Sequence, residues 1–326
     1  MDSLNDSCVS SKDINDGILQ REESRYQRKG YGLIFAVLFT LFGFTVFPQL
    51  IQFRILSLLQ NLQPQYIQMI MLISTHLLGF SLGNLGMYFI YEAKSPFFER
   101  YRTRQNQWPW DENPDEWQKK CKEVWKYNSI NMTLGVLMCI LDTQISPLLR
   151  NDIDTFPSLF EMTWQILFSM LIEDTCFYWT HRTLHSPKLY PIIHKKHHEF
   201  YTSVSYAAIY THPIEYIFGN VIPVFVGSKI LGSQMHIATL QLWLLFRIGE
   251  TIDGHSGYEF SWSPYRLLPF SSSAESHNYH HSHNVGNYGS FFIFWDTIMG
   301  SNESYNSFIA KKYGKINKIK DNNKKE

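Results

Sequence analysis

The stretch HRTLHSPKLYPIIHKKHH, residues 181–198, decides what kind of fold and site this sequence encodes. It holds five histidines in eighteen residues, namely His181, His185, His194, His197 and His198. The first two are four residues apart and the last three follow an i, i+3, i+4 spacing, so each set places its imidazoles on one face of a helix. Pro187 and Pro191 separate the sets, so we predict that one helix ends near His185 and another begins after Pro191.

Histidine is concentrated in the second half of the chain. Twelve of the thirteen histidines follow residue 180, and His277, His280 and His281 repeat the i, i+3, i+4 spacing. His212 and His255 stand at the two ends of an apolar segment that we interpret as a hairpin, so both are expected on the same side as the clusters. The remaining three are single and are interpreted as ordinary core or surface residues: His76, His236 and His283.

Ten of these imidazoles are predicted to bind metal. Neutral imidazole is a ligand of Fe, Zn, Cu and Ni, and one zinc ion takes four ligands, so ten histidines fit two metal ions better than one. The chain has no HExxH motif of a zinc peptidase, and an all-histidine set differs from the carboxylates of soluble four-helix di-iron proteins. The predicted ligands are His181, His185, His194, His197, His198, His212, His255, His277, His280 and His281.

Four apolar segments are long enough to cross a bilayer as helices, which takes about 20 residues each. They are Tyr31–Gln52, Tyr66–Glu92, Asn128–Leu149 and Leu159–Thr180. The second carries Gly79, Gly83 and Gly86, small residues that allow close helix contact in lipid. The alternative is a soluble protein with long buried helices, but such helices seldom stay apolar over this length. We therefore predict an all-α integral membrane protein with about four transmembrane helices.

Lysine and arginine alternate between the predicted loops. Residues 1–30 hold five and residues 93–127 hold eight, whereas loops 53–65 and 150–158 hold one each. Basic loops of membrane proteins face the cytosol. We therefore expect the N-terminus, the 93–127 loop and the histidine clusters on the cytosolic side.

A further apolar region, Ile214–Ile252, is divided by a turn near Gly232. We predict a hairpin that either spans the membrane or re-enters it, with its two ends on the side of the histidine clusters. The chain then divides into a polar N-terminal segment expected to be disordered, a membrane part with a charged loop, a histidine-rich, metal-binding part and a polar, Lys-rich tail. Their boundaries are 1–30, 31–156, 157–300 and 301–326.

Composition excludes several classes of function. Lys plus Arg and Asp plus Glu each number 29, so no basic surplus indicates nucleic-acid binding. The four cysteines include no C-x-x-C pair, so neither a disulfide framework nor a thiolate zinc site is expected. The first thirty residues lack the pattern of a cleavable signal peptide, and none is expected.

The three clusters HRTLH, HKKHH and HNYHH, in this order, resemble the histidine boxes of the membrane fatty acid hydroxylase/sterol desaturase superfamily. The linking segments YTHPIEY (210–216), ETIDGHSGY (250–258) and GNYGSFFIFWD (286–296) are similar to those of C4-methylsterol monooxygenases. The resemblance covers about residues 157–300 and is weak before them. It is specific for the superfamily and less so for the substrate.

This resemblance implies a di-iron, O2-dependent oxidase of the endoplasmic reticulum membrane that oxidises a C4-methyl group of a sterol precursor. It also implies that residues 157–300 form the catalytic domain and that a cytosolic helical cap above the membrane helices carries the histidines. It implies electrons from NAD(P)H through a reductase and cytochrome b5, and a separate C4-decarboxylating sterol dehydrogenase that acts on the acid product. Three positions depart from the pattern: Ile209 replaces an acidic residue, and Ser276 and Asn278 replace a further His-Asp pattern. Because of Ile209, a sterol desaturase, a sterol hydroxylase and a fatty acid hydroxylase stay open as alternatives.

Metal-bound imidazoles usually donate their second N–H to a carboxylate or carbonyl. The carboxylates predicted for this role are Asp174, Glu215, Glu250 and Asp253, with ordinary helix-end charge as the alternative. Aromatic residues such as Phe177, Phe291 and Trp295 either line a route for the lipid or belong to an interfacial belt. An alternative from another class is a non-catalytic membrane protein whose histidines hold zinc or serve structure.

Overall fold

The computed structural model describes residues 29–104, 107–145, 148–152, 154–266, 268–309 and 311, without the side chains of residues 29–31 and 52–54. Over these ranges the chain is helical and has no β-strand, as the sequence predicts. The N-terminal segment predicted to be disordered and most of the Lys-rich tail lie outside the described residues.

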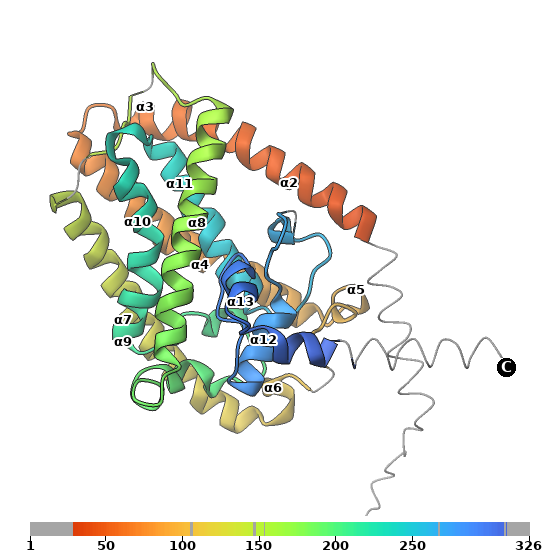
Figure 1. The fold of residues 1–326 in the computed structure, drawn as a ribbon. Coiled ribbons are helices and arrows are strands. Elements are labelled where there is room, and N and C mark those ends of the chain that lie inside the picture. The colour runs from red at the N-terminus through yellow and green to blue at the C-terminus, as the bar shows by residue number, and fades with distance from the viewer. Residues whose placement is uncertain are drawn as a thin grey trace, which may run out of the picture.

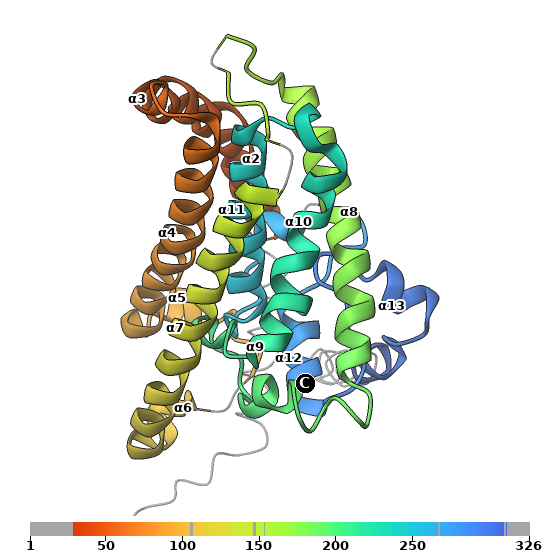
Figure 2. The same ribbon diagram turned by 90° about the vertical axis from the view of Figure 1, so that its left-hand side faces the viewer.

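Long helices lie side by side and form a bundle (Figures 1 and 2). They are α4 (Pro64–Ala93), α7 (Pro114–Ile145), α8 (Leu159–Leu184), α10 (Ile222–Leu231) and α11 (Ile237–Gly254). The helix α2 (Lys29–Leu50) packs against α11 and α8 and continues through a π-helical turn and a short helix, η1 (Ile51–Leu56) and α3 (Ser57–Leu59). A second π-helical segment, η4 (Tyr216–Val221), joins α9 (Pro213–Glu215) to α10.

The helix α11 forms the centre of the bundle. All eight residues from Ile237 to Leu244 are buried, and the Trp243 indole N–H donates to the Val224 carbonyl of α10. The outward faces of the surrounding helices are apolar instead, with large exposed side chains such as Leu33 of α2, Phe89 of α4 and Phe160 of α8. An apolar exterior around a packed interior is the arrangement that a lipid environment requires.

Three described segments are long and apolar enough to cross a membrane: Gly32–Leu50, Pro64–Ala93 and Pro213–Gln234. The first two match predicted spans, and the third is the first half of the predicted hairpin. The predicted spans Asn128–Leu149 and Leu159–Thr180 fall largely within α7 and α8, but neither helix meets the same criterion of length and composition.

The composition of α8 explains this difference. One face of the helix carries polar residues that are buried inside the bundle: Gln165, Ser169, Glu173 and Asp174. Its other face carries exposed apolar residues such as Leu171. The average along the helix is therefore less apolar than its outer face, and a sequence average understates how the helix meets lipid.

The predicted hairpin extends over the full length of the bundle. Its turn, η5 (Gly232–Gln234), lies beside Arg150 in the connection between α7 and α8. The Arg150 N–H donates to the Met235 carbonyl at 3.0 Å, and the Ile237 N–H donates to the Arg150 carbonyl at 2.7 Å. Since this connection lies at the end opposite the C-terminus of α8, the hairpin spans the bundle and does not turn back halfway (Figure 2).

The histidine clusters and the basic loop lie at the same end of the bundle. Short elements form this cap: α5 (Pro96–Glu99), α6 (Pro109–Glu112), η2 (His194–Glu199), η3 (Ser205–Ala207), η6 (Pro264–Arg266), α12 (Ala274–His283), α13 (Phe294–Ile298) and a helix over 303–309. Backbone bonds join the basic loop to the segment after α11, from Thr103 N–H to the Gly257 carbonyl and from Glu259 N–H to the Tyr101 carbonyl. The fold therefore places the 93–127 loop and the histidine clusters at one end of the bundle, as predicted.

Two of the three glycines singled out in α4 serve helix contact. A Cβ on Gly79 or Gly83 would meet side chains of α11, whereas Gly86 has nothing within 4 Å. The closest approach to the backbone of a neighbouring bundle helix is elsewhere: a Cβ on Gly227 of α10 would lie 2.8 Å from the Ser169 Cα of α8.

We expect Gly227→Val to destabilise the protein by about 2–3 kcal/mol, because the added carbon atoms force α8 and α10 apart. Gly86→Val is the matched control and is expected to change stability little. Thermal unfolding of both full-length variants in the same detergent measures the difference. Equal melting temperatures for the two variants would contradict the packing described here.

Candidate metal centre

Five histidines from three elements converge at the end of α8. His181 and His185 end that helix, His194 and His198 belong to the 3-10 helix η2, and His280 belongs to α12. One ring nitrogen of each lies within 4.8 Å of those of the others, and we call this set the five-histidine group. The expected second helix is thus a short 3-10 helix, whose three-residue turn still places His194 and His197 on one side.

Four further histidines form a second group beside the first. His197 comes from η2, His255 follows α11, and His277 and His281 come from α12; their ring nitrogens also lie within 4.8 Å of one another. We call this set the four-histidine group. The two groups are in contact, since the His198 and His281 rings stack with their centroids 4.8 Å apart.

The Nε2 atoms within each group lie close together. In the five-histidine group, the His194 Nε2 is 3.2 Å from that of His181 and 3.0 Å from that of His198. In the four-histidine group, the His277 Nε2 is 2.9 Å from that of His255 and 3.1 Å from that of His281. Metal–nitrogen bonds of about 2.1 Å place neighbouring ligand nitrogens about 3.0–3.4 Å apart. Each group therefore fits one metal ion.

Hydrogen bonds at Nδ1 orient four of these rings. His181 donates to the Tyr288 carbonyl at 3.0 Å, His255 to the Thr251 carbonyl at 2.8 Å, and His280 to the Gly286 carbonyl at 2.6 Å. The fourth, His194, donates to the Glu215 carboxylate at 2.8 Å. A ring that donates through Nδ1 keeps a lone pair on Nε2, which is the atom that points into the group.

Burial keeps these imidazoles neutral. His194, His280 and His281 are each at most 1% exposed. Burial lowers the pKa of His198 to about 3 and that of His255 to about 4; the His181 imidazole contributes to the lower pKa of His198, and the Arg247 guanidinium to that of His255. Since neutral imidazole is the form that binds metal, the site is prepared for ligation at neutral pH.

The structure leaves His212 outside both groups, which hold the other nine of the ten predicted ligands. His212 precedes Pro213 at the start of α9, where its Nδ1 accepts the Ile214 N–H at 3.2 Å and caps that helix. The placement of a histidine at a hairpin end therefore reflects helix capping. The single histidines His76, His236 and His283 also lie outside both groups, as predicted.

Of the four carboxylates predicted to support ligands, Glu215 contacts an imidazole. Asp174 instead accepts the backbone N–H groups of Ser290 and Phe292, at 3.1 and 3.0 Å. It thereby holds the segment that follows Tyr288, whose carbonyl orients His181. Asp174 therefore holds the backbone of the loop after Tyr288 and makes no hydrogen bond to a histidine ring among the described residues.

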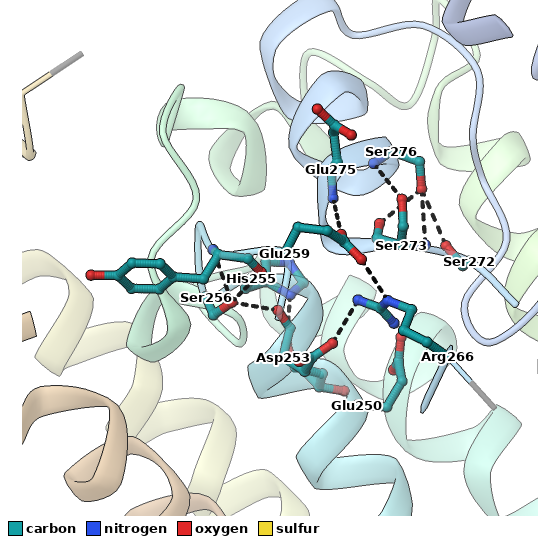
Figure 3. Close-up of polar contacts among 12 residues, drawn as sticks. Glu250, Asp253, His255, Ser256, Glu259, Arg266, Ser272, Ser273, Glu275 and Ser276 are labelled. Carbon is teal, nitrogen blue, oxygen red and sulfur yellow. Dashed lines mark hydrogen bonds and ion pairs between the residues drawn. The ribbon is translucent and has the colours of Figure 1, made fainter. Parts of the chain in front are cut away.

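Glu250 and Asp253 likewise bind arginines and not imidazoles. Arg266 lies between the Asp253 and Glu259 carboxylates, at 2.7 and 2.8 Å, and Glu259 also accepts the backbone N–H of Glu275 (Figure 3). Because Glu275 is in the first turn of α12, this network fixes the start of the helix that carries His277 to the end of α11, where His255 stands. Here too the predicted carboxylates position elements that carry ligands.

A buried ion network that the sequence analysis did not identify lies beside the centre. The Arg247 guanidinium, 5% exposed, donates to Glu173 at 2.7 Å and to Glu250 at 2.8 Å. Glu173 has no exposed surface. The sequence signal for this network was Arg247, a charged residue in the mainly apolar helix α11. A charged residue inside a membrane bundle usually has an oppositely charged partner.

The three departures from the family's pattern have structural roles. Ser276 and Ser273 form a capping box at the start of α12, and the Asn278 side chain accepts the Ser203 N–H at 3.3 Å. Ile209 is buried in a small apolar cluster with Tyr216 and Val221. None of the three contacts a ligand nitrogen through a bond described here.

A cavity opens onto both groups. Five of the clustered histidines line it: His181, His194, His197, His255 and His277. Its other walls include Phe177, Arg247 and Phe291. The Arg247 guanidinium lies over both aromatic rings, 5.4 Å from the Phe177 centroid and 5.9 Å from that of Phe291. Of the predicted lipid-route aromatics, Phe177 and Phe291 thus line this cavity, whereas Trp295 packs on Tyr178 and Trp179.

Comparison with known proteins identifies relatives of this arrangement. The family model for fatty acid hydroxylases matches residues 166–301. The chain is 39% identical to the methylsterol monooxygenase erg25B of Aspergillus fumigatus, over 50% of this chain and 56% of that protein, so it spans just over half of that relative. It is 33% identical to methylsterol monooxygenase 2-2 of Arabidopsis thaliana, over 68% of this chain and 80% of that protein. No solved structure matches.

A relative with a different printed activity aligns over more of its length. The very-long-chain aldehyde decarbonylase GL1-8 of Oryza sativa subsp. indica is 31% identical to this chain. The alignment covers 71% of this chain and 89% of that protein. The similarity therefore extends well beyond the histidine clusters into the membrane helices.

We expect His281→Ala to lower the metal content of the purified full-length protein by about one ion per chain, because it removes a ligand from the four-histidine group. His212→Ala is expected to leave the metal content unchanged, because His212 caps α9. Elemental analysis of both variants after iron loading measures this. A loss of metal in His212→Ala, or none in His281→Ala, would contradict the two groups as drawn here.

We expect Glu215→Ala to weaken metal binding by about tenfold or more, because His194 loses the acceptor that fixes its ring. Glu215→Gln keeps an acceptor oxygen and is expected to retain most of the affinity. Asp111→Ala, which removes a surface ion pair with Lys94, serves as a control. Competition with a chelator gives the affinities, and an unchanged affinity in Glu215→Ala would remove Glu215 from this role.

Proposed function

The chain belongs to the fatty acid hydroxylase family, and from that premise we propose that it is a membrane-bound di-iron monooxygenase that oxidises a C4-methyl group of a sterol precursor with O2. The observation that carries the proposal is the pair of adjacent all-histidine groups at the end of an apolar helix bundle. The family and its relatives make the chain an oxygen-dependent oxidoreductase; the sterol is the finer step that we propose.

The nine histidines of the two groups are the residues that would hold the irons. When bound, the two irons supply the O2 chemistry needed to oxidise an unactivated C–H bond. The chain itself supplies neutral, oriented imidazoles, through the Nδ1 bonds to Glu215 and to the backbone carbonyls of Thr251, Gly286 and Tyr288. Neutral imidazole nitrogen is a ligand type that suits iron.

The cavity beside the groups provides the place for the substrate. Phe177 and Phe291 give part of this cavity apolar walls, against which a hydrocarbon is buried favourably. The buried Arg247 is already neutralised by Glu173 and Glu250. The cavity therefore favours a largely apolar molecule over an anionic one.

We further propose that electrons come from NAD(P)H through cytochrome b5 and its reductase, and that the protein lies in the endoplasmic reticulum membrane with the histidine cap in the cytosol. The basic loop at the same end supports a docking surface for an acidic electron carrier. The product acid would then pass to a C4-decarboxylating sterol dehydrogenase.

A second candidate is decarbonylation of a very-long-chain aldehyde. The observation that favours it is the alignment that covers 89% of the rice aldehyde decarbonylase. The cavity walls suit either an extended chain or a ring system. Turnover of each substrate class by the protein therefore distinguishes the two candidate functions.

We expect membranes that contain the wild-type protein, NADPH, O2 and a 4,4-dimethylsterol to form the C4-carboxylated sterol, and membranes with His281→Ala to form none, because one metal group is lost. Mass spectrometry of the extracted sterols measures the product, with a very-long-chain aldehyde as the parallel substrate. Turnover of the aldehyde alone would establish the second candidate. Zinc as the bound metal and no turnover of either would indicate a non-catalytic protein.

A further inference from the structure

Three hollow regions of the membrane bundle lie next to one another and share lining residues. The first is the metal cavity described above. The second, which we call the membrane cavity, is lined mainly by apolar residues of α4, α7, η4, α10 and α11, such as Phe80, Met132 and Val224. It shares three lining residues with the metal cavity, namely Asn220, Arg247 and Thr251. These three residues therefore mark the junction between the two.

The third region, which we call the outer groove, lies between α7 and α10. It is lined by apolar residues such as Leu141 and Ile222, and it shares Val221 and Phe225 with the membrane cavity. Exposed side chains on both helices, such as Ile145 and Ile230, place it on the apolar exterior of the bundle. The outer groove, the membrane cavity and the metal cavity thus follow one another from the apolar exterior to the histidine groups, with shared residues between neighbouring regions.

Two of the three junction residues already have hydrogen-bond partners. Arg247 is bound by Glu173 and Glu250, and the Thr251 hydroxyl donates to the Arg247 carbonyl. The Asn220 amide, in contrast, makes no hydrogen bond to any residue in the part of the chain that the structure describes. A half-buried amide among apolar residues is costly when its donor and acceptor stay unpaired, which indicates a ligand as its partner.

The local backbone supports this interpretation. Asn220 lies in the π-helical segment η4, and its neighbours Ile217, Phe218 and Val221 are apolar. π-helical turns inside α-helices are frequent at functional sites, and a polar residue at membrane depth is seldom there without a function. The segment begins directly after Glu215, which holds His194, so the free amide and the metal-supporting carboxylate are on one continuous helix.

We propose that the Asn220 amide binds the single polar group of the lipid substrate, a hydroxyl, and thereby sets which carbon faces the histidine groups. The inference rests on the proposed function and names the residue that selects its substrate. An amide donates to and accepts from a hydroxyl, whereas the surrounding walls offer only apolar contact to the rest of the molecule. A sterol with its 3-hydroxyl at the junction fits this pattern, and a hydrocarbon without a hydroxyl leaves the amide unpaired.

The test compares two sterols and two variants of the full-length, metal-loaded protein in lipid nanodiscs. The sterols are a tritiated 4,4-dimethyl-3β-hydroxysterol and its 3-deoxy analogue. The variants are Asn220→Leu and the matched control Asn84→Leu, whose amide donates to the Phe80 carbonyl of its own helix and lines none of the three regions. Equilibrium binding is measured by scintillation proximity, and metal content is measured in parallel.

We expect Asn220→Leu to raise the Kd for the hydroxysterol about tenfold, which is the loss typical of one neutral hydrogen bond. The Kd for the deoxy analogue, the metal content and all values for Asn84→Leu are expected to stay unchanged. In turnover, the same variant should raise KM for the hydroxysterol more than it lowers kcat.

Unchanged binding of the hydroxysterol, or equal weakening for both sterols, would overturn the proposal, because neither result depends on the hydroxyl. Binding needs no turnover, so this test is separate from that of the proposed function. A hydroxyl-dependent loss in a protein that forms no C4-carboxylated sterol would support Asn220 and contradict the proposed reaction. Formation of the C4-carboxylated sterol, together with unchanged hydroxysterol binding in Asn220→Leu, would support the proposed reaction and contradict the role of Asn220.

Discussion

The fold of the cap depends on one constraint: nine imidazoles must present Nε2 to two adjacent points. An imidazole has two nitrogens, and the ring presents Nε2 as an acceptor only when Nδ1 carries the proton. The acceptors that hold Nδ1 come from distant parts of the chain, with Glu215 at the start of α9, Thr251 in α11, and the carbonyls of Gly286 and Tyr288 in one loop. The loop turns at Gly286, where φ is +64°, a conformation that favours glycine. The metal centre is therefore what ties these segments together.

Polar contacts, more than apolar ones, give the bundle its specific arrangement. In lipid, an apolar side chain gains little by turning inward, because the surroundings are as apolar as the interior. Close approach at Gly227 and the network of Arg247 with Glu173 and Glu250 distinguish the inner faces of α8, α10 and α11 from their outer ones. Loss of one partner would leave an uncompensated charge inside the bundle, which is far costlier than the net gain from forming the pair. The network therefore fixes α8 against α11, the two helices that end at His181–His185 and His255.

The sequence predicts the helices and most of the histidines that the structure groups together, because both follow from local spacing. The spans of α2 and α4 and all eight clustered histidines could be read from periodicity, and His255 from its place at a helix end. His212 had the same local signal, yet it caps α9, since only the three-dimensional path of the chain decides which end of a hairpin faces the clusters. The roles of Asp174, Glu250 and Asp253 depend on partners far away in sequence, such as Ser290 and Arg266, so spacing alone could not assign them. The hairpin's full length likewise became clear only from its contact with Arg150.

One continuous element, α9 followed by η4 and α10, carries both the support of the metal centre and the wall of the lipid path. Glu215 orients His194, and five residues further on Asn220 faces the junction of the two cavities. Because Asn220 lines the same metal cavity as His194 and His197, the proposed binding point for the polar group is close to the histidine groups. This short separation favours a substrate whose oxidised carbon is close to its polar group, as the C4-methyl of a sterol is to the 3-hydroxyl. It disfavours oxidation far along a fatty acyl chain, because the polar end of that chain would then have to lie well away from Asn220.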